Sequence, residues 1–368
     1  MAKNGMNVGI DLEQSSIAGA QIRGGKSGQT LMAAAVRALP EGLVFEGEVI
    51  DVEGLAAELK GFWKAAGFSG RRLRLGVANQ KIVVRTMEFP LIDEKELEAA
   101  IQFQAQEAIP IPLDDAILDY QVLATVPGEE GAGKQKVLIV AAQRDMIGRF
   151  VEAASKAGLN VEGIDLQAFA LTRAVTPPVA FIDQGGGTQS TEVSALVHVG
   201  SGITNLVVAA GGMPQFTRVI NLGCESLVQA LITNRGIGHD EADALRLQVG
   251  LSGGSHEGIA DLEAETIAEV HKTLDTASEA FADEIRRSID YYHSQEPDGQ
   301  ITDLLITGEG ALTRYMPEYL TEALHLPVSL GNAVQRITEN KTKLSQAELE
   351  TMAPRLAVAV GLALEDEE

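Results

Sequence analysis

The stretch Gly9-Ile-Asp-Leu-Glu-Gln-Ser-Ser16 has the pattern of a buried strand that ends in a tight polar turn. The same order of strand, turn and strand returns in His198-Val-Gly-Ser-Gly-Ile-Thr-Asn205, and Leu305-Ile-Thr-Gly-Glu-Gly-Ala311 places glycines after a third apolar strand. Small residues let backbone N–H groups approach a phosphate, and glycines let a nucleoside lie against the backbone. Each stretch alone also fits an ordinary turn. Their order in one chain predicts two phosphate-binding turns followed by a nucleoside-binding turn.

The chain around these stretches divides into two similar halves. Each half begins with a strand, a turn of small residues and a second strand, and then alternates strands with helices. This alternation indicates layered α/β domains, and 368 residues are more than one core usually holds. Apolar residues at helical spacing predict helices over 55–66, from Asp93 to Pro110 and through 274–292. A cleft between two such halves is a natural ligand site.

The composition restricts the classes of partner. The formal net charge is -23, and the 45% of hydrophobic residues is ordinary for a soluble globular protein. A chain this acidic is repelled by nucleic-acid phosphates and by anionic lipid surfaces. We therefore expect no nucleic-acid binding and no direct membrane insertion, so that any membrane association would need a protein partner.

The single cysteine, Cys224, excludes an intrachain disulfide and a cysteine metal cluster. The first residues lack the apolar stretch of a signal peptide, and no segment has the roughly 18 apolar residues of a membrane-spanning helix. The sequence therefore predicts a cytoplasmic protein.

Short motifs in a fixed order run through nearly the whole chain. They are Gly9-Ile-Asp11, Leu39-Pro-Glu-Gly42, Gly47-Glu-Val-Ile-Asp51, Phe89-Pro90, Glu96-Leu97, Ala108-Ile-Pro-Ile-Pro112, Asp119-Tyr-Gln-Val-Leu123, Phe216-Thr-Arg218, Glu284-Ile-Arg-Arg-Ser-Ile-Asp-Tyr-Tyr292 and Ala357-Val-Ala-Val-Gly-Leu-Ala363. Together they resemble the PilM family of type IV pilus assembly proteins, which belongs to the actin-like ATPase superfamily. The related cell-division protein FtsA shares this fold, and the Ile-Pro-Ile-Pro motif favours PilM.

This resemblance implies a fold class and a domain organisation. The expected fold is α/β and actin-like (ribonuclease H-like), a duplicated two-lobed fold with an inserted α/β subdomain in the first lobe. The first-lobe core would comprise residues 1–73 and 161–178, and the inserted subdomain residues 74–160. The second lobe would comprise residues 179–368, with its own insertion at about 224–300.

In the family, ATP and Mg2+ lie between the lobes, so the resemblance also implies site residues. Asp11 would orient the Mg2+ ion. The expected nucleotide contacts are Asp11, Gln14, Ser15, Ser16, Gly200, Ser201, Gly202, Thr204, Gly223, Asp243, Arg246, Gly308, Gly310 and Ala311.

The sequence departs from the family pattern at the residues that would touch nucleotide. Glu13 stands where the family has glycine, and a carboxylate beside a triphosphate is repulsive. His198 replaces an aspartate, Asp243 and Arg246 replace a Glu and a Lys, and Glu309 interrupts the third turn. The stretch Asp183-Gln-Gly-Gly-Gly-Thr188 is an alternative second phosphate turn, although no strand follows it as expected. These departures predict that ATP and Mg2+ binding is weakened.

The resemblance implies an interaction protein rather than a catalyst. It would be a scaffold that binds the cytoplasmic N-terminal peptide of PilN, an inner-membrane protein, and through it PilO, with the pilus motor ATPases as further candidate partners. The residues expected in a peptide groove are Ile109, Ile111, Tyr120 and Val122, which would equally suit the core of the inserted subdomain. The alternative function is that of an FtsA-like filament former that binds and hydrolyses ATP. No catalytic residue is expected, and at most a weak ATPase activity.

Overall fold

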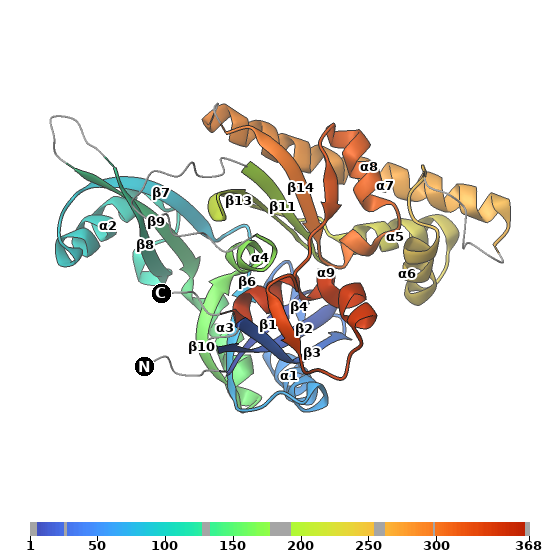
Figure 1. Ribbon diagram of the computed structural model, residues 1–368, viewed down its shortest axis with the longest axis horizontal. Helices are drawn as coiled ribbons and strands as arrows, with labels where there is room; N and C mark the ends of the chain where they lie inside the picture. The colour runs from blue at the N-terminus through green and yellow to red at the C-terminus, as the bar shows by residue number, and fades with distance from the viewer. Residues whose placement is uncertain are drawn as a thin grey trace. The chain divides into compact units, whose positions relative to one another are not determined.

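The computed structural model describes residues 6–25, 28–126, 133–176, 193–253, 262–296 and 299–364. The chain forms two compact units, one of residues Met1–Ala78 and Ala154–Glu368 and the other of residues Asn79–Ala153 (Figure 1). Asp183–Thr188, the alternative phosphate turn, lies outside the described residues.

The larger unit contains a six-stranded sheet with the strand order β10-β6-β1-β2-β3-β16. β1, β2 and β3 form an antiparallel meander, whereas β6 pairs parallel to β1, β10 to β6 and β16 to β3. The bounds are β1 (Met6–Leu12), β2 (Ser16–Gly25), β3 (Gly28–Ala38), β6 (Arg72–Val77), β10 (Asn160–Leu166) and β16 (Ile337–Asn340).

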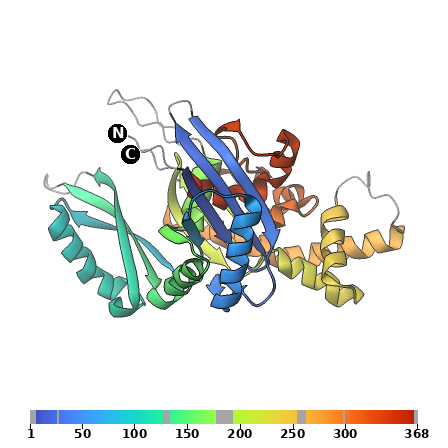
Figure 2. The same cartoon turned by 90° about the horizontal axis from the view of Figure 1, so that it is seen from below.

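Helices cover both faces of this sheet (Figure 2). α1 (Val52–Ala66) begins at the Asp51 cap, ends at Gly67 in the left-handed conformation, and buries Leu55, Leu59 and Phe62. α9 (Gln346–Ala363) packs so closely on the other face that a Cβ on Gly9 would lie 2.1 Å from the Ala359 carbonyl oxygen. α4 (Gln167–Val175) packs against α9.

The same unit contains a five-stranded sheet with the order β13-β12-β11-β14-β15. Its strands are β11 (Val193–Val199), β12 (Thr204–Ala210), β13 (Met213–Ile220), β14 (Ile301–Thr307) and β15 (Val328–Leu330). The helices that follow in the chain are α5 (Cys224–Arg235), α6 (His239–Gln248), α7 (Ala264–Gln295) and α8 (Met316–Leu324), with the short 3-10 helix η3 (Gly310–Leu312). Leu274, Phe281 and Ile285 of α7 join the buried core of this part. The two-residue strands β4 (Val44–Phe45) and β5 (Glu48–Val49) form a separate ribbon.

The smaller unit contains a three-stranded antiparallel sheet with the order β7-β9-β8. Its elements are β7 (Val83–Pro90), α2 (Glu94–Ala108), the 3-10 helix η1 (Leu113–Asp115), β8 (Ala116–Val126), β9 (Lys134–Gln143) and the start of α3 (Arg144–Lys156). Leu97, Ile101 and Ala105, one face of α2, form the core with Val137 and Ile139 of β9.

The helices expected from apolar spacing are confirmed as α1, α2 and α7. β10 and α4 were not expected, and together they position Gln167, a residue of the site described below. The expected bounds of the inserted subdomain, 74 and 160, fall in β6 and at the start of β10, which are both strands of the six-stranded sheet. The assignment of the units to the family's subdomains stays a prediction.

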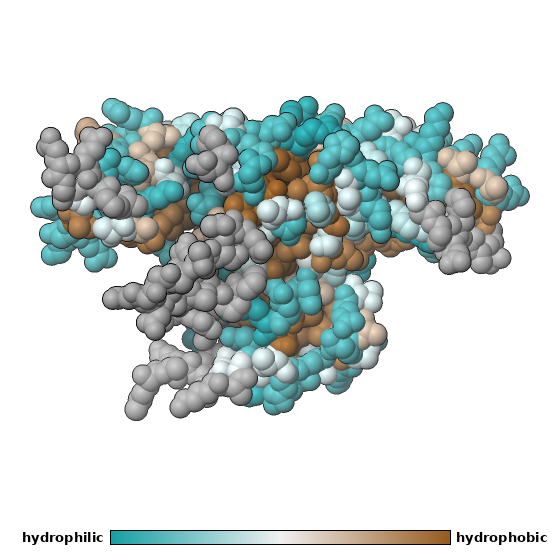
Figure 3. Space-filling view, turned by 45° about the horizontal axis from the view of Figure 1, so that its top comes forward, coloured by the Kyte–Doolittle hydropathy of each residue, from teal (hydrophilic) through white to brown (hydrophobic). Residues whose placement is uncertain are grey.

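Hydrophilic side chains cover most of the face shown in Figure 3, and hydrophobic side chains lie mainly in recessed areas between them. Among the residues that the structure describes, no helix is both long and apolar enough to cross a membrane.

Candidate functional site

Two hairpin turns in the larger unit have the same geometry. β1 and β2 pair up to Leu12 and Ile17, and β11 and β12 pair up to Val199 and Thr204. In the first turn the Glu13 N–H donates to the Ser16 carbonyl at 2.9 Å, and in the second the Gly200 N–H donates to the Ile203 carbonyl at 2.9 Å. Residues of the two turns therefore correspond in sequence: Asp11 corresponds to His198, and Glu13 to Gly200.

The two turns contact each other through the Glu13 side chain. One carboxylate oxygen, Oε1, lies 2.8 Å from Nε2 of His198, and the other, Oε2, accepts a hydrogen bond of 2.5 Å from the Ser201 N–H. The Glu13 side chain is only 8% exposed. A backbone N–H of the second turn, the kind of donor expected to bind phosphate, is therefore occupied by a carboxylate of the chain itself.

His198 and Asp11 are each held by neighbours on the adjoining strands and helix. His198 is paired with Asn205 of β12 and Thr307 of β14, and its Nδ1 lies 3.1 Å from the Thr307 hydroxyl. The amide of Gln167, the first residue of α4, donates to Asp11 at 2.7 Å and accepts from Asn205 at 2.7 Å. Nε2 of His198 lies 3.9 Å from Asp11 Oδ2. The result is a buried polar network that joins both sheets.

The remaining predicted phosphate contacts lie around this network. The Ser15 N–H donates to the Ser201 hydroxyl at 3.1 Å, and a Cβ on Gly202 would lie 2.4 Å from the Gln14 side-chain oxygen. The Cys224 N–H, at the start of α5, donates to the Gly200 carbonyl at 2.9 Å. The first N–H groups of α5, which could attract an anion, are thus directed to the second turn.

Ser16, Thr204 and Gly223 have structural contacts at the edges of the turns. Ser16 is paired with Ala38 of β3, and the Thr204 hydroxyl donates to the Leu222 carbonyl at 2.7 Å. A Cβ on Gly223 would lie 2.3 Å from the Ser201 carbonyl oxygen, so the start of α5 needs glycine there whether or not a ligand binds.

The third turn packs directly on β11. Gly308 has a φ of 88° and, with a Cβ, would approach the Val199 carbonyl oxygen to 2.3 Å. A Cβ on Gly310 would lie 2.2 Å from Val199 Cγ1, and Ala311 is buried. Close packing therefore explains these glycines, without any nucleoside.

A second buried polar cluster lies beside this turn. Arg246 of α6 is fully buried, and its guanidinium donates to Asp243 at 2.9 Å and to the Thr313 hydroxyl at 2.8 Å. It also lies 3.3 Å from Glu309 Oε1, and Arg355 of α9 donates to the same oxygen at 2.8 Å. Glu309 interrupts a predicted nucleotide turn, as Glu13 does, and its carboxylate is bound by the cationic side chains of Arg246 and Arg355.

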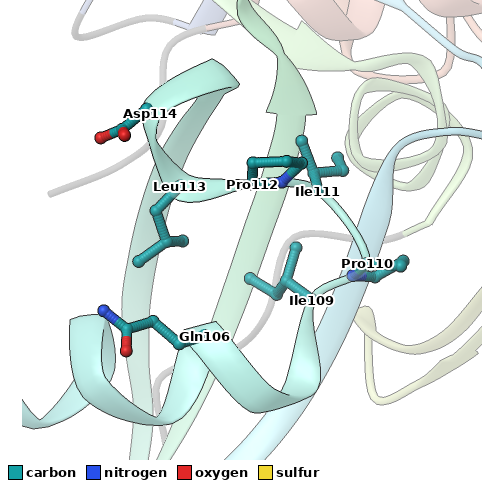
Figure 4. A pocket seen from close by; sticks show the side chains of 7 residues that line it. All are labelled: Gln106, Ile109, Pro110, Ile111, Pro112, Leu113 and Asp114. Atoms are coloured by element: carbon teal, nitrogen blue, oxygen red, sulfur yellow. The ribbon is translucent and has the colours of Figure 1, made fainter.

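The predicted peptide-groove residues belong to the smaller unit and do not form one surface. Ile109 and Ile111 are 6% and 7% exposed and lie in its core, Tyr120 packs against that core, and Val122 is 45% exposed. A pocket of 520 Å³ opens beside Ile109 and Ile111. Its lining is Gln106, Ile109, Pro110, Ile111, Pro112, Leu113 and Asp114 (Figure 4). Leu113 and Gln106 point toward each other there, whereas Asp114 points away.

A family model described as "Type IV pilus assembly protein PilM" matches residues 9–367. The chain belongs to the PilM family. The match covers both halves and every motif on which the resemblance was based, so the resemblance to this family is confirmed.

Solved structures with this fold include other PilM-family and actin-like proteins. The structure "PilM-PilN type IV pilus biogenesis complex" is similar at 22% identity, with 98% of both chains covered and a TM-score of 0.81. The ethanolamine utilization protein EutJ from Carboxydothermus hydrogenoformans follows with 14% identity, 98% and 90% coverage and a TM-score of 0.53. MreB5 of Spiroplasma citri bound to ADP has 12% identity, 96% and 94% coverage and a TM-score of 0.51. The predicted actin-like α/β fold is thus confirmed.

Actin-like relatives bind nucleotide, as the ADP complex of MreB5 shows. In this PilM-family chain the donors do not fit a triphosphate as they stand. The Glu13 carboxylate accepts the hydrogen bond of the Ser201 N–H and fills the space beside Gly200. A Cβ on Gly200 would lie 2.5 Å from Oε1 of Glu13. Asp11, the predicted Mg2+ ligand, accepts a hydrogen bond from Gln167, and its Oδ2 lies 3.9 Å from the imidazole of His198, which stands where an aspartate was expected.

Gln167, Asn205 and Thr307 were not predicted as site residues. The first follows β10 at the start of an unpredicted helix, and the other two are buried polar residues in the strands on either side of His198. Polar residues at register positions beside His198 were the available signal, because an apolar strand interior rarely carries an unbonded polar group.

The buried network has perturbed pKa values. Burial raises the pKa of Asp11 to about 7, and the neighbouring charge of Glu13 adds to this rise. Burial alone opposes the charged forms of Glu13 and His198, but their mutual hydrogen bond and attraction lower the pKa of Glu13 and raise that of His198. Their pairing therefore favours the carboxylate of Glu13 and the imidazolium of His198 over the neutral forms.

These directions predict a pH dependence of stability. Asp11 binds its proton more tightly in the native state, so its contribution is present below its ordinary pKa of 3.8 and is lost as the pH rises to about 7. The contribution of His198 is likewise present below pH 6.5 and is lost above it, through its raised native pKa. When the pH rises from about 5 to about 8, the unfolding free energy of the wild type should fall because Asp11 loses its proton. In Asp11→Asn this fall should be smaller by roughly 2 kcal/mol. Urea unfolding at both pH values measures this.

The exposed carboxylate Asp114 provides the control for this measurement. Asp114→Asn should keep the wild-type pH profile, because this exposed side chain has no part in the buried network around Asp11. If Asp11→Asn keeps that profile as well, Asp11 does not titrate as inferred.

Proposed function

We propose that this chain is a cytoplasmic scaffold of the type IV pilus assembly platform that binds the N-terminal peptide of a PilN-like inner-membrane protein. The observation that carries this proposal is the family match over residues 9–367, supported by the similar fold of the solved PilM–PilN complex. A net charge of -23 opposes adsorption to anionic lipid, so the partner would hold the protein at the inner face of the membrane.

The wider assembly follows from the same proposal. A PilN-like partner would connect the chain indirectly to PilO, and the pilus motor ATPases are candidate partners. Residues 1–73 and 161–178 would be the first-lobe core, residues 74–160 the inserted subdomain, and residues 179–368 the second lobe with an insertion at about 224–300. Bound peptide would contact the inserted subdomain.

The pocket at the end of α2 is the proposed place for the peptide. It follows the Ile-Pro-Ile-Pro motif, and its open side combines the half-buried Leu113 with the exposed residues Gln106, Pro110 and Pro112. The prolines fix the backbone dihedral φ, so this surface would lose little conformational entropy when a peptide binds. Ile109 and Ile111 form its floor and also belong to the core.

Calorimetric titration with a synthetic peptide of the cytoplasmic N-terminus of PilN tests this function. We expect binding at micromolar affinity and an affinity about tenfold lower for Leu113→Ala, since truncation of an interface anchor typically costs over 1 kcal/mol. Val151→Ala, in which an exposed valine (41%) of the smaller unit is truncated, should bind as the wild type does. Absence of binding to the wild-type chain at high micromolar peptide would refute the proposal.

Nucleotide binding by this chain is proposed to be weakened, with at most a weak ATPase activity. Glu13 and Glu309 both stand in nucleotide turns and both have partners in the chain. The alternative function, an FtsA-like filament former, requires ATP to enter between these turns. Sedimentation with Mg-ATP separates the two, because a filament former would pellet and a monomeric scaffold would stay in solution.

A further inference from the structure

The two hairpin turns carry different residues at one corresponding position, and the side chain of the first turn contacts the second turn there. Glu13 and Gly200 occupy the same place in turns of the same geometry, closed by hydrogen bonds of equal length, 2.9 Å. The Glu13 side chain of the first turn extends over Gly200 of the second. A Cβ on Gly200 would lie 2.5 Å from Oε1, so a side chain at one position requires glycine at the other.

The Glu13 carboxylate makes the contacts that an anion bound to the second turn would make. One oxygen accepts from the Ser201 backbone N–H, and the other contacts the imidazole of His198. Hydrogen bonds to an ionised group are about twice as strong as neutral ones. With 8% of the Glu13 side chain and 2% of the His198 side chain exposed, water hardly competes for either group.

The partner of the carboxylate is itself fixed. Thr307 lies at 3.1 Å from His198 Nδ1, which leaves Nε2 directed to Glu13. Gln167 donates to Asp11, which lies 3.9 Å from the same imidazole nitrogen, Nε2, and it also accepts a hydrogen bond from Asn205. The first turn and the second turn thus belong to one network that spans both sheets.

We propose that the Glu13 carboxylate is a built-in substitute for a bound phosphate, which joins the β1–β2 turn to the β11–β12 turn without any ligand. A tethered group needs no free ligand to stay bound, because its effective concentration is set by the chain. The larger unit is then held closed at all times, and neither ATP binding nor hydrolysis controls the contact between its two sheets. This inference concerns the cohesion of that unit and is independent of peptide binding.

Thermal unfolding of the full chain, alone and with inorganic triphosphate or Mg-ATP, tests the proposal. The wild-type midpoint should not change with either ligand. Glu13→Gln keeps the size of the side chain but loses its charge, and should melt roughly 5 °C lower. Glu13→Gly should also melt lower, and inorganic triphosphate should restore several degrees by binding in the vacated space. Glu41→Gln, at an exposed glutamate, is the control and should melt as the wild type does.

Hydrogen exchange gives a second readout that does not depend on the ligand. Peptides that cover residues 9–17 and 193–204 should exchange faster in Glu13→Gln, whereas those from α7 should not change. If Glu13→Gly does not fold, this comparison and the lower melting point of Glu13→Gln decide the question.

Four results would overturn the proposal. The first is that Mg-ATP stabilises the wild type and Glu13→Gly equally, and the second is that hydrogen exchange in Glu13→Gln is unchanged. The third is that Glu13→Gly is destabilised but neither ligand restores its melting point. The fourth is that the wild type loses stability when it is treated with EDTA. The last result would assign the link to a metal ion, since ligand atoms of Asp11, Glu13 and His198 lie within 4.8 Å of one another.

Discussion

Replacing Gly361 by alanine is expected to lower the free energy of unfolding by roughly 3 kcal/mol or more. α9 crosses α4 at this residue, and an alanine Cβ would lie 1.8 Å from the Ala170 carbonyl oxygen and 2.9 Å from its Cα. Both are backbone atoms, so the overlap is relieved only if the two helices separate. Because α4 begins with Gln167 and α9 carries Arg355, separation would also disturb the residues that hold Asp11 and Glu309. The midpoint of urea unfolding measures the effect.

Gly148 provides a matched control for this substitution. It is an exposed glycine within α3, and a Cβ there would have nothing within 4 Å. Gly148→Ala should therefore raise the unfolding free energy by roughly 0.5 to 1 kcal/mol, since alanine is the better helix former. Opposite signs for the two substitutions are the critical outcome. Equal effects would show that the α4–α9 approach is not as tight as the structure has it.

The fold was predictable from the sequence wherever periodicity was strong. The 32-residue helix α7 has buried residues at regular helical spacing, and the strand–turn–strand stretches are confirmed as β1–β2 and β11–β12. β10 was missed because Glu162 and Gly163 interrupt its apolar pattern, and α4 because it has only nine residues and no side-chain cap. Those two segments position Gln167, so the error in local structure concealed a member of the site.

The candidate site was predicted as a location but not as a network. Sequence motifs identified the turns at residues 11–16 and 200–204, and Glu13 and His198 were interpreted as two separate losses from a phosphate site. The structure shows that they contact each other at 2.8 Å, across 185 positions of the sequence. A motif comparison treats each position alone, whereas a carboxylate and an imidazole that replace family residues together can compensate each other's charge. Only the three-dimensional arrangement shows which of the replaced residues meet.

The neighbours of the predicted groove residues and of the third turn were likewise not predictable from the sequence. Ile109 and Ile111 suit both a groove and a core by their apolar character, and their exposed fractions of 6% and 7% place them in the core with one side toward the pocket. Gly308 and Gly310 are explained by their approach to Val199. Glycine in a sequence indicates a close approach without indicating what approaches.

Replacing Arg246 by methionine is expected to lower the free energy of unfolding of the chain by about 3 kcal/mol. Its guanidinium is fully buried and is the shared donor for Asp243, Glu309 and Thr313. Methionine fills a similar volume but leaves the carboxylates of Asp243 and Glu309 with less compensating charge. Among the described residues, Glu309 would then keep only Arg355 as a cationic partner. Removal of one partner of a buried ion pair costs more than the pair itself contributes, because the remaining charge is left unpaired.

Two further variants separate this charge effect from a packing effect. Arg72→Met removes an exposed pair with Glu162, in which the arginine side chain is 60% exposed, and should cost less than about 1 kcal/mol. Adding Glu309→Gln to Arg246→Met should recover part of the loss, because it removes the carboxylate that was left unpaired. If the double variant is less stable than the sum of the single ones, or Arg246→Met costs no more than Arg72→Met, the cluster is not held by charge. If the double variant instead recovers part of the lost stability, the Glu309 carboxylate depends on the cationic side chains of the chain itself and is not available to bind a nucleoside.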